Sequence, residues 1–400
     1  MTLTRRQAMK MGVAGLAGLA LSPTNSYGRY FRILEENKKR GMAPEDAVWL
    51  VFNVNPLGSS NKAYDVMRRS VRLSHHYGEY HGYELLRNLH EMHGLKFSDM
   101  ENPDSYFARY AAFNQNPIML GFGGTEFLQA IARHANDQGG NYVEIQPTYG
   151  EITGTINRLP KVRIERRSVH ETVGHEASPE EILAKTDRNT RLIHIINPSN
   201  PTGRVYSPEA LVYLMDNKPP ETLLLIDEAY IHYAPSNRVK SMIGEAVSRE
   251  NVVVLRTMSK AYGLAAKRVG YIVGNPETFK SMALRPMGGY YQNPVAMLMA
   301  KEALGDKKFV EKSVNHANSV KARYLDYFAE LGLRPRPSAT SFMWVHTDRD
   351  LSGVVRELEK ENIFIKSGHQ YGEPNHIRVS IGTNRQVNRF FNIFRDKMKG

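Results

Sequence analysis

The chain has 400 residues, of which 41% are hydrophobic and 24% are charged. This composition suits one large or two smaller globular domains and argues against extensive disorder. Basic residues outnumber acidic ones by 53 to 41, for a formal charge of +12. No RRM, KH, zinc-finger or basic-zipper pattern accompanies this charge, so we expect small anionic ligands and no nucleic acid. The lack of cysteine excludes disulfides, thiolate catalysis and cysteine-bound metals.

The amino terminus has the features of an export signal. Thr4-Arg5-Arg6-Gln7-Ala8-Met9-Lys10 precedes a short apolar run at residues 11–21, and a basic head before such a run is typical of a secretory signal. The adjacent arginines resemble the twin-arginine export signal. We expect residues 1–28 to be this signal and the protein to be periplasmic or otherwise extracytoplasmic. An ordinary amphipathic terminus and a general export signal are the alternatives.

No clean small-x-small cleavage site follows the apolar run, because Ala20-Leu21-Ser22 is followed by Pro23 and Ser26-Tyr27-Gly28 is only a substitute. An uncleaved signal that anchors the protein to the membrane therefore stays open. Apart from the export machinery, we expect no interaction with a membrane.

From about residue 117 onward, short apolar runs alternate with helical patterns, which predicts an α/β domain with a largely parallel sheet. Ser178 and Ser207 each precede a proline, which is typical of a helix start. A long helical stretch near residues 295–330 leads into a final segment of mixed strand and helix signals. The expected strands are at residues 118–120, 143–145, 192–196, 223–226 and 252–255, and the expected helices between them are at 126–135, 179–185 and 208–215.

The simplest organisation is a large central domain and a smaller domain built from both ends of the chain. We expect the large, ligand-binding domain at residues 65–301 and the small domain at residues 29–64 and 302–400. We find no internal repeat and no low-complexity segment.

Thr257-Met258-Ser259-Lys260 follows an apolar strand and leads to Arg268. The carboxyl edge of a parallel sheet is where open α/β folds bind ligands. A lysine there can form an imine with an aldehyde cofactor, while hydroxyl groups and a guanidinium suit a phosphate. A surface lysine after a strand would look the same, so this motif is weak by itself.

Asp227-Glu228-Ala229-Tyr230 ends the apolar strand before it. A carboxylate at this place can keep a pyridine nitrogen protonated, which makes the ring an electron sink. Tyr230 could donate a hydrogen bond to the phenolic oxygen of the same ring. An aspartate that merely caps the following turn is the structural alternative.

Two further loops follow expected strands. In Asn197-Pro198-Ser199-Asn200-Pro201-Thr202-Gly203 the prolines restrict the backbone and hold Asn200 in one orientation. In Gly121-Phe122-Gly123-Gly124-Thr125-Glu126 the glycines precede a helix, where backbone N–H groups can approach a phosphate. Tight turns use the same residues, so the combination of four loops in this order is the stronger signal.

The four loops, in this order, resemble the fold-type-I pyridoxal-phosphate enzymes, in the branch that contains histidinol-phosphate aminotransferase. The most specific stretch runs from Leu255 through Lys260 to Tyr271, and the resemblance covers most of the chain after the signal. It implies the α/β transferase fold of aspartate aminotransferase, with a mainly parallel sheet in the large domain and a smaller α+β domain. It also implies an aminotransferase that moves an amino group between an amino acid and a 2-oxo acid by a ping-pong mechanism.

The resemblance assigns roles to residues of this sequence. Lys260 is implied to be the Schiff-base lysine, with Asp227 at the ring nitrogen and Tyr230 at the ring oxygen as the other catalytic residues. Asn55, Arg378 and Lys366 are implied to bind substrate, and Arg378 is implied to bind the carboxylate of the substrate. No metal is implied. The remaining cofactor-binding residues are implied to be Tyr77, Gly124, Thr125, Tyr149, Asn200, Thr257, Ser259 and Arg268.

The substrate side departs from that branch. Lys366 stands where histidinol-phosphate enzymes usually have arginine, Ser341 replaces an asparagine, and Gly78 replaces a proline. Histidine synthesis is also a cytoplasmic task, which does not match an export signal. We therefore expect a different substrate. Tyr77 matches a tyrosine that reaches the phosphate of a neighbouring subunit, which implies a homodimer.

Two other functions remain open at this stage. The cofactor motifs do not decide which bond breaks, so a pyridoxal-phosphate-dependent decarboxylase, lyase or racemase has the same signature. A non-catalytic exported binding protein would not need Lys260, Asp227 and Arg378 together. His90-Glu91-Met92-His93 is one residue too short for the zinc-protease motif.

Overall fold

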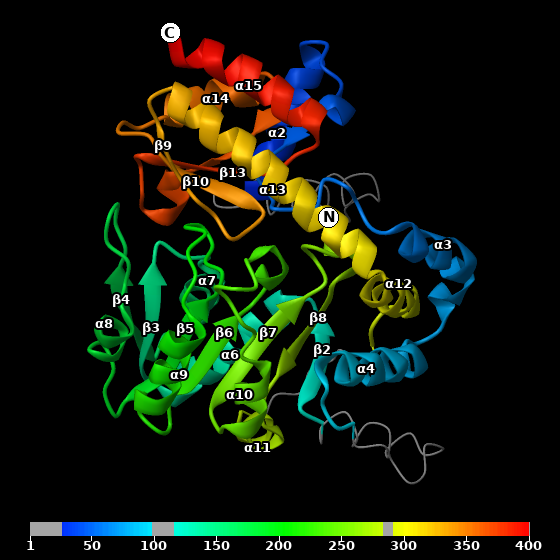
Figure 1. The fold of residues 1–400 in the computed structure, drawn as a ribbon, viewed down its shortest axis with the longest axis vertical. Helices are drawn as coiled ribbons and strands as arrows, with labels where there is room; N and C mark the ends of the chain where they lie inside the picture. The colour runs from blue at the N-terminus through cyan, green and yellow to red at the C-terminus, as the bar shows by residue number, and fades with distance from the viewer. Residues whose placement is uncertain (1–25, 98–115, 283–290, 400) are drawn as a thin grey trace, which may run out of the picture.

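The computed structural model describes residues 26–97, 116–282 and 291–399. The expected signal lies almost wholly outside these residues. The described chain forms a large α/β part and, above it in Figure 1, a smaller part made from both ends of the chain. Within the described ranges, no helix combines the length and the apolar character that crossing a membrane requires.

A seven-stranded sheet forms the centre of the large part, in the order β2-β8-β7-β6-β5-β3-β4. All neighbours are parallel except β8, which runs antiparallel to both β2 and β7. β2 therefore points in the same direction as the other strands. The strands are β2 (Ile118–Phe122), β3 (Gly140–Gln146), β4 (Ile164–His170), β5 (Thr190–Ile196), β6 (Leu223–Asp227), β7 (Val252–Thr257) and β8 (Val269–Val273).

Helices cover both faces of this sheet, which explains why its strands are apolar runs. One face packs against helices from the beginning, middle and end of the large part, and the other packs mainly against α6 and α7. On the first face are α3 (Asn61–Ser70), α4 (Glu79–His93), α8 (Pro179–Leu183), α9 (Pro208–Asn217), α10 (Ile243–Ser248) and α12 (Pro294–Gly305); on the second are α6 (Gly124–Gln138), α7 (Glu151–Asn157) and α11 (Pro276–Ser281).

The smaller part contains a four-stranded antiparallel sheet in the order β12-β13-β10-β9 and a parallel pair, β1 with β11. Its helices pack on this sheet around a separate core. In Figure 1, α13 runs from this part towards α12 of the large part. The elements are β1 (Val48–Trp49), β9 (Arg334–Arg336), β10 (Phe342–His346), β11 (Ile363–Phe364), β12 (Lys366–Ser367), β13 (His376–Ser380), α2 (Ser26–Lys39), α13 (Lys307–Glu330), α14 (Ser352–Lys360) and α15 (Asn384–Lys399).

The expected α/β class, the mainly parallel large sheet and the smaller α+β part are confirmed. All five expected strands form, and Ser178 and Ser207 accept hydrogen bonds from the first turns of α8 and α9. The expected helical stretch at 295–330 is two helices, because the chain turns at Gly305 and Asp306 caps the second one. The limits expected for the two domains stay a prediction.

Candidate active site

The four loops singled out in the sequence leave the same edge of the large sheet. Asn200 follows β5, Asp227 ends β6, and Lys260 follows β7, and these three strands are parallel neighbours. Gly123 follows β2, which runs in the same direction. The expectation that the loops meet at one carboxyl edge is therefore confirmed.

A cradle without side chains forms where β2 leads into α6. Gly123 has φ +73° and caps the helix, and a Cβ added to it would lie 2.3 Å from Nη2 of Arg268. A Cβ on Gly270 would lie 2.6 Å from the carbonyl carbon of Gly123. These contacts require glycine. They place a guanidinium beside the N–H groups of Gly124 and Thr125 at the start of a 15-residue helix, which is a favourable place for a phosphate.

Arg268 is held by its own backbone and by that of β2. It adopts a left-handed conformation with φ +53°. Its Nη1 donates to the carbonyl of Ala265 at 2.9 Å and its Nη2 to the carbonyl of Phe122 at 3.4 Å. The guanidinium therefore stays next to the glycine cradle while further N–H groups are available to an anion.

Thr257 and Ser259 add hydroxyl groups before Lys260. The two hydroxyl oxygens are 2.9 Å apart, and the backbone N–H of Ser259 also donates to the hydroxyl of Thr257 at 3.1 Å. Both side chains are buried. This arrangement fixes the loop that carries Lys260 and aligns its hydroxyls for an acceptor.

The amine of Lys260 is withdrawn from water. Burial lowers the pKa of Lys260 to about 8, helped by the positive charge of Arg378 and opposed by Asp227. Its Nζ lies 5.4 Å from the centre of the Tyr230 ring. Because the uncharged amine is the nucleophilic form, this environment favours reaction with a carbonyl group.

Asp227 and Tyr230 each keep a polar group that a ligand can use. Oδ1 of Asp227 accepts from the backbone N–H of Ala229 at 2.9 Å, and among the described residues no donor binds Oδ2. The hydroxyl of Tyr230 accepts from Nδ2 of Asn53 at 3.0 Å, which leaves its own proton free to be donated. Burial raises the pKa of Tyr230 to about 12, so the hydroxyl keeps that proton.

Asn200 and Arg378 are joined. Nη1 of Arg378 donates to Oδ1 of Asn200 at 2.7 Å and to the hydroxyl of Tyr371 at 2.6 Å, and Nη2 donates to the carbonyl of Val51 at 2.7 Å. Oδ1 of Asn200 is thus occupied by Arg378, while its amide nitrogen can still donate a hydrogen bond to a ligand. Nε of Arg378 is buried without a partner.

Lys366 is the register partner of Arg378. The two residues face each other across β12 and β13, so their side chains leave the same face of the sheet. Nζ of Lys366 donates to Oε1 of Gln370. Burial, together with the positive charges of Arg378 and Arg29, lowers the pKa of Lys366 to about 8.

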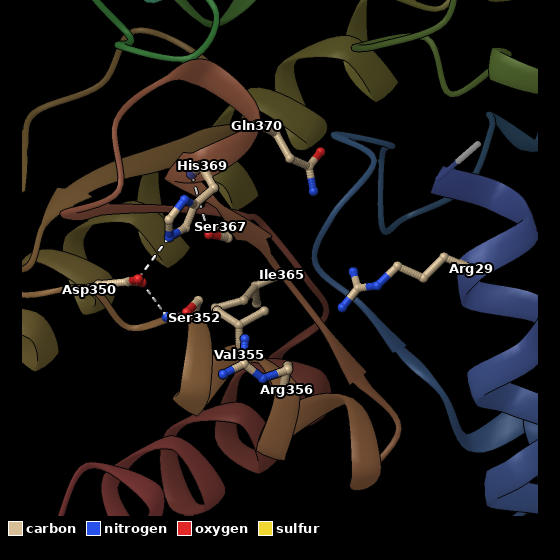
Figure 2. A pocket seen from close by; sticks show the side chains of 9 residues that line it. All are labelled: Arg29, Asp350, Ser352, Val355, Arg356, Ile365, Ser367, His369 and Gln370. Carbon is tan, nitrogen blue, oxygen red and sulfur yellow. Dashed lines mark hydrogen bonds and ion pairs between the residues drawn. The ribbon is translucent and has the colours of Figure 1, made fainter. Parts of the chain in front are cut away.

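A cavity of about 380 Å³ lies on the far side of Gln370. Figure 2 shows Arg29 of α2 reaching in from one side, with Gln370 above it, Ile365 facing it and Arg356 below. His369, hydrogen-bonded to Asp350, closes one side.

Tyr149 lies at the end of the loop that follows β3. Loss of contact with water raises the pKa of its hydroxyl, with smaller effects from Glu151, Tyr230 and Asp227. The ring still has 38% of its surface exposed. An exposed aromatic face close to Asp227 and Tyr230 fits the stacking role that the resemblance implies.

Asn55 and Tyr77 are the two remaining predicted site residues. Asn55 uses its amide within the protein: Nδ2 donates to the carbonyl of Ala261 and to the hydroxyl of Ser313, both at 2.9 Å, and Oδ1 accepts from the N–H of Leu57 at 3.0 Å. It thereby holds its loop against the Lys260 loop, and its substrate role stays a prediction. Tyr77 is 70% exposed and packs edge-on against Tyr291, with ring centres 6.4 Å apart.

The structure explains one departure from the family. A Cβ on Gly78 would lie 2.0 Å from the carbonyl oxygen of Gln292, so the backbone approach excludes any side chain there.

Sequence reasoning missed Asn53 and Tyr371. Asn53 orients Tyr230, and Tyr371 orients Arg378. Asn53 lies in a loop and Tyr371 ends a short 3₁₀ helix, and neither belongs to a sequence motif, so only the fold reveals them.

The comparisons with known proteins agree with this geometry. Residues 45–394 match the family described as aminotransferase class I and II. The chain is 31% identical over 359 residues to histidinol-phosphate aminotransferase 2 of Pseudomonas aeruginosa, covering 88% of this chain and 89% of that protein.

Two solved structures share the fold. The histidinol-phosphate aminotransferase of Sinorhizobium meliloti in complex with pyridoxal 5′-phosphate superposes with a TM-score of 0.78 at 23% identity, over 92% of this chain and 94% of that one. Aspartate aminotransferase of Thermus thermophilus with maleate gives 0.75 at 19% identity, over 99% and 100%. The predicted aspartate aminotransferase-like fold is confirmed.

Pyridoxal phosphate, the cofactor of this family, fits the residues present. The glycine cradle and Arg268 suit its phosphate, Oδ2 of Asp227 suits its ring nitrogen, and the amine of Lys260 suits its aldehyde. The chain belongs to the class I and II aminotransferases and is a pyridoxal-phosphate-dependent aminotransferase.

Proposed function

We propose that the chain is an exported, dimeric aminotransferase whose amino donor carries two negative charges, most simply a dicarboxylic amino acid. The pair of Lys366 and Arg378 is the observation that supports this substrate class. Within the described ranges, neither side chain has a carboxylate partner; the groups that they contact are neutral. A buried cation, Arg378, beside a half-buried one, Lys366, without counter-ions is costly unless an anionic ligand neutralises them.

The cofactor supplies an electron sink that stabilises negative charge at the α-carbon of the substrate. The residues of the chain bind the cofactor and the substrate and orient them relative to each other. Arg378 presents a planar guanidinium to the α-carboxylate, which it can bind with two hydrogen bonds. Asp227 would hold the ring nitrogen of the cofactor through Oδ2, and the hydroxyl of Tyr230 and the amide of Asn200 would hold its ring oxygen.

Lys260 moves the proton. With the cofactor bound, Nζ of Lys260 would hold its aldehyde and would then be the base that takes the proton from the α-carbon of the substrate. The pKa of about 8 keeps part of this amine unprotonated near neutral pH. Release of the first 2-oxo acid and entry of the second complete a ping-pong cycle.

Replacing Lys366 by methionine tests the substrate class. We expect Lys366→Met to raise KM for aspartate or glutamate by about tenfold or more, because a hydrogen bond to a charged group contributes about 1.5–3 kcal/mol. KM for alanine should stay within about twofold. Steady-state kinetics over a panel of donors measures both, and equal effects on all donors would contradict the proposal.

The effect of pH on KM gives a second test of the role of Lys366, with Lys366→Arg as its control. Because the pKa of Lys366 is lowered to about 8, its charge is lost as the pH rises through that value. The ratio of KM for aspartate to KM for alanine should therefore rise above about pH 8, and Lys366→Arg should remove this rise. Histidinol phosphate belongs in the same panel. If it alone reacts, the dicarboxylic class is wrong.

The export proposal is supported by Arg5 and Arg6 ahead of an apolar run. We expect the double replacement Arg5→Lys and Arg6→Lys to retain the protein in the cytoplasm, because the twin-arginine pathway reads the arginine pair. Fractionation of cells and immunoblotting give the location. Unchanged export would favour a general signal instead.

The dimer proposal is supported by Tyr77, whose side chain is exposed and which the resemblance assigns to the phosphate site of a neighbouring subunit. If Tyr77 completes the phosphate site of a second copy, mixing Lys260→Ala chains with Tyr77→Phe chains should create hybrids with one intact site. We expect cofactor affinity and activity to recover in the mixture above those of either variant alone. No recovery, or a mass of one chain by light scattering, would refute the shared site.

A further inference from the structure

A short chain of hydrogen bonds joins strand β13 to Tyr230. Ser380 is the last residue of β13, and Asn53 lies in the loop that follows β1, where it adopts a left-handed conformation with φ +55°. The backbone N–H of Asn53 donates to Oγ of Ser380 at 3.0 Å, and Oγ of Ser380 donates to Oδ1 of Asn53 at 2.6 Å. Nδ2 of Asn53 then donates to the hydroxyl of Tyr230 at 3.0 Å. The three residues are at most 4% exposed, so water does not compete for these bonds.

Ser380 fixes the orientation of the Asn53 amide. A serine hydroxyl has one proton to donate. Because Oγ of Ser380 already accepts from the backbone N–H of Asn53, its own proton is directed to Oδ1 of the same residue. With the amide reversed, the NH2 group would face Oγ, and the serine proton would lack an acceptor among the described residues. The amide nitrogen is therefore the end that faces Tyr230.

This orientation decides the direction in which Tyr230 donates. An amide NH2 group donates and does not accept, so Asn53 cannot take the proton of the Tyr230 hydroxyl. Burial raises the pKa of Tyr230 to about 12, and the hydroxyl therefore keeps its proton near neutral pH. The ring is held edge-on against Phe342, with ring centres 5.3 Å apart, and Nζ of Lys260 lies 5.4 Å from its centre. The proton of Tyr230 thus stays available to a ligand bound next to Lys260.

We propose that Ser380 and Asn53 form a one-way relay that reserves the hydroxyl proton of Tyr230 for the ring oxygen of the cofactor. Both are positioning residues, which act through Tyr230 rather than by contact with the substrate or the cofactor. A hydrogen bond donated to the ring oxygen favours the charged form of that oxygen. The relay therefore lowers the pKa of the bound cofactor. It is independent of the substrate class, the export and the dimer proposed above.

The relay begins on the strand that also carries Arg378. Arg378 is two residues before Ser380, and its Nη2 donates to the carbonyl of Val51, two residues before Asn53. The backbone N–H of Ser380 donates to the carbonyl of Leu50 at 2.9 Å. One pair of segments thus holds both the guanidinium that we propose for the substrate carboxylate and the first link of the relay. A movement that separates these segments would also weaken the donor at the ring oxygen.

A pH titration of the absorption of the cofactor-loaded protein tests the relay. Asn53→Asp keeps the shape of the side chain, and aspartate tolerates the left-handed backbone. Its carboxylate accepts the proton that Tyr230 would otherwise donate to the cofactor. We expect the pKa read from the absorption band of the bound cofactor to rise by about one unit, which is a tenfold gain in proton affinity. An unchanged pKa in the loaded, folded variant would overturn the proposal.

Tyr230→Phe separates the relay from the added charge of the aspartate. This variant lacks the hydroxyl, so the pKa of the bound cofactor should rise at least as much as in Asn53→Asp. In the Tyr230→Phe background, Asn53→Asp should cause less than about half of the shift that it causes with Tyr230 in place, since both changes act through one proton. A shift of equal size would mean that the carboxylate acts on the cofactor directly, and the relay would be refuted.

Ser380→Ala tests the first link by a smaller change, and it also serves if Asn53→Asp does not fold. Without the serine hydroxyl, the amide of Asn53 can turn and accept the proton of Tyr230. We expect the pKa of the bound cofactor to rise, by less than in Asn53→Asp, while KM for the amino donor stays within about twofold. No shift in Ser380→Ala would mean that the serine does not orient the amide, which contradicts the proposal.

Asn136→Asp is the matched control. Asn136 is 2% exposed, as Asn53 is, and it also uses both ends of its amide: Oδ1 accepts from the N–H of Arg163 at 2.8 Å, and Nδ2 donates to the carbonyl of Lys161 at 3.1 Å. It lies near the C-terminal end of α6, whereas the glycine cradle lies at the other end. The variant introduces the same carboxylate at the same burial and should leave the pKa of the bound cofactor unchanged. A comparable shift in Asn136→Asp would overturn the assignment of the effect to Tyr230.

Discussion

The whole site depends on keeping the amine of Lys260 away from water and yet within reach of a carboxylate. Burial makes the ammonium form less favourable, and the cations of Arg378 and Arg268 add to this, while Asp227 opposes it. A lysine in such surroundings is a nucleophile near neutral pH. The parallel sheet makes this possible, because three neighbouring strands end at one edge and bring Asn200, Asp227 and Lys260 together.

The two parts of the chain meet at that edge. A Cβ on Gly263 would lie 1.8 Å from the carbonyl oxygen of Gly58, and Ser59 donates to the carbonyl of Tyr262 at 3.2 Å. The amino-terminal loop therefore lies directly on the Lys260 loop. From the small part, Arg378 reaches Asn200 of the large part. The substrate binding that we propose for Arg378 and the chemistry that we propose for Lys260 would thus be linked through these contacts, and a small shift between the parts would alter both.

Sequence reasoning located the cofactor side of the site because that side is made of local motifs. Apolar runs predict strands, and the residues that follow each run are then expected at the carboxyl edge of the sheet. The strand at 164–170 was missed because it lies at the edge of the sheet and is rich in polar residues, including Glu165, Arg166 and Arg167. The strand at 269–273 was recognised only as part of a motif.

The remaining parts required the fold. Asn53 contacts Tyr230, which is 177 residues away, and Tyr371 contacts Arg378 of the neighbouring strand β13, so neither role follows from a local motif. The role of Asn55 as a clamp between loops was hidden for the same reason: its partner Ser313 is 258 residues away.

The most direct test of the central claim is borohydride reduction of the cofactor-loaded protein, followed by mass spectrometry of its peptides. Reduction makes an imine between lysine and the cofactor permanent. The account predicts the added mass of the reduced cofactor on the peptide that contains Lys260, and on no other. An unmodified Lys260 peptide, or attachment at another lysine, would contradict it.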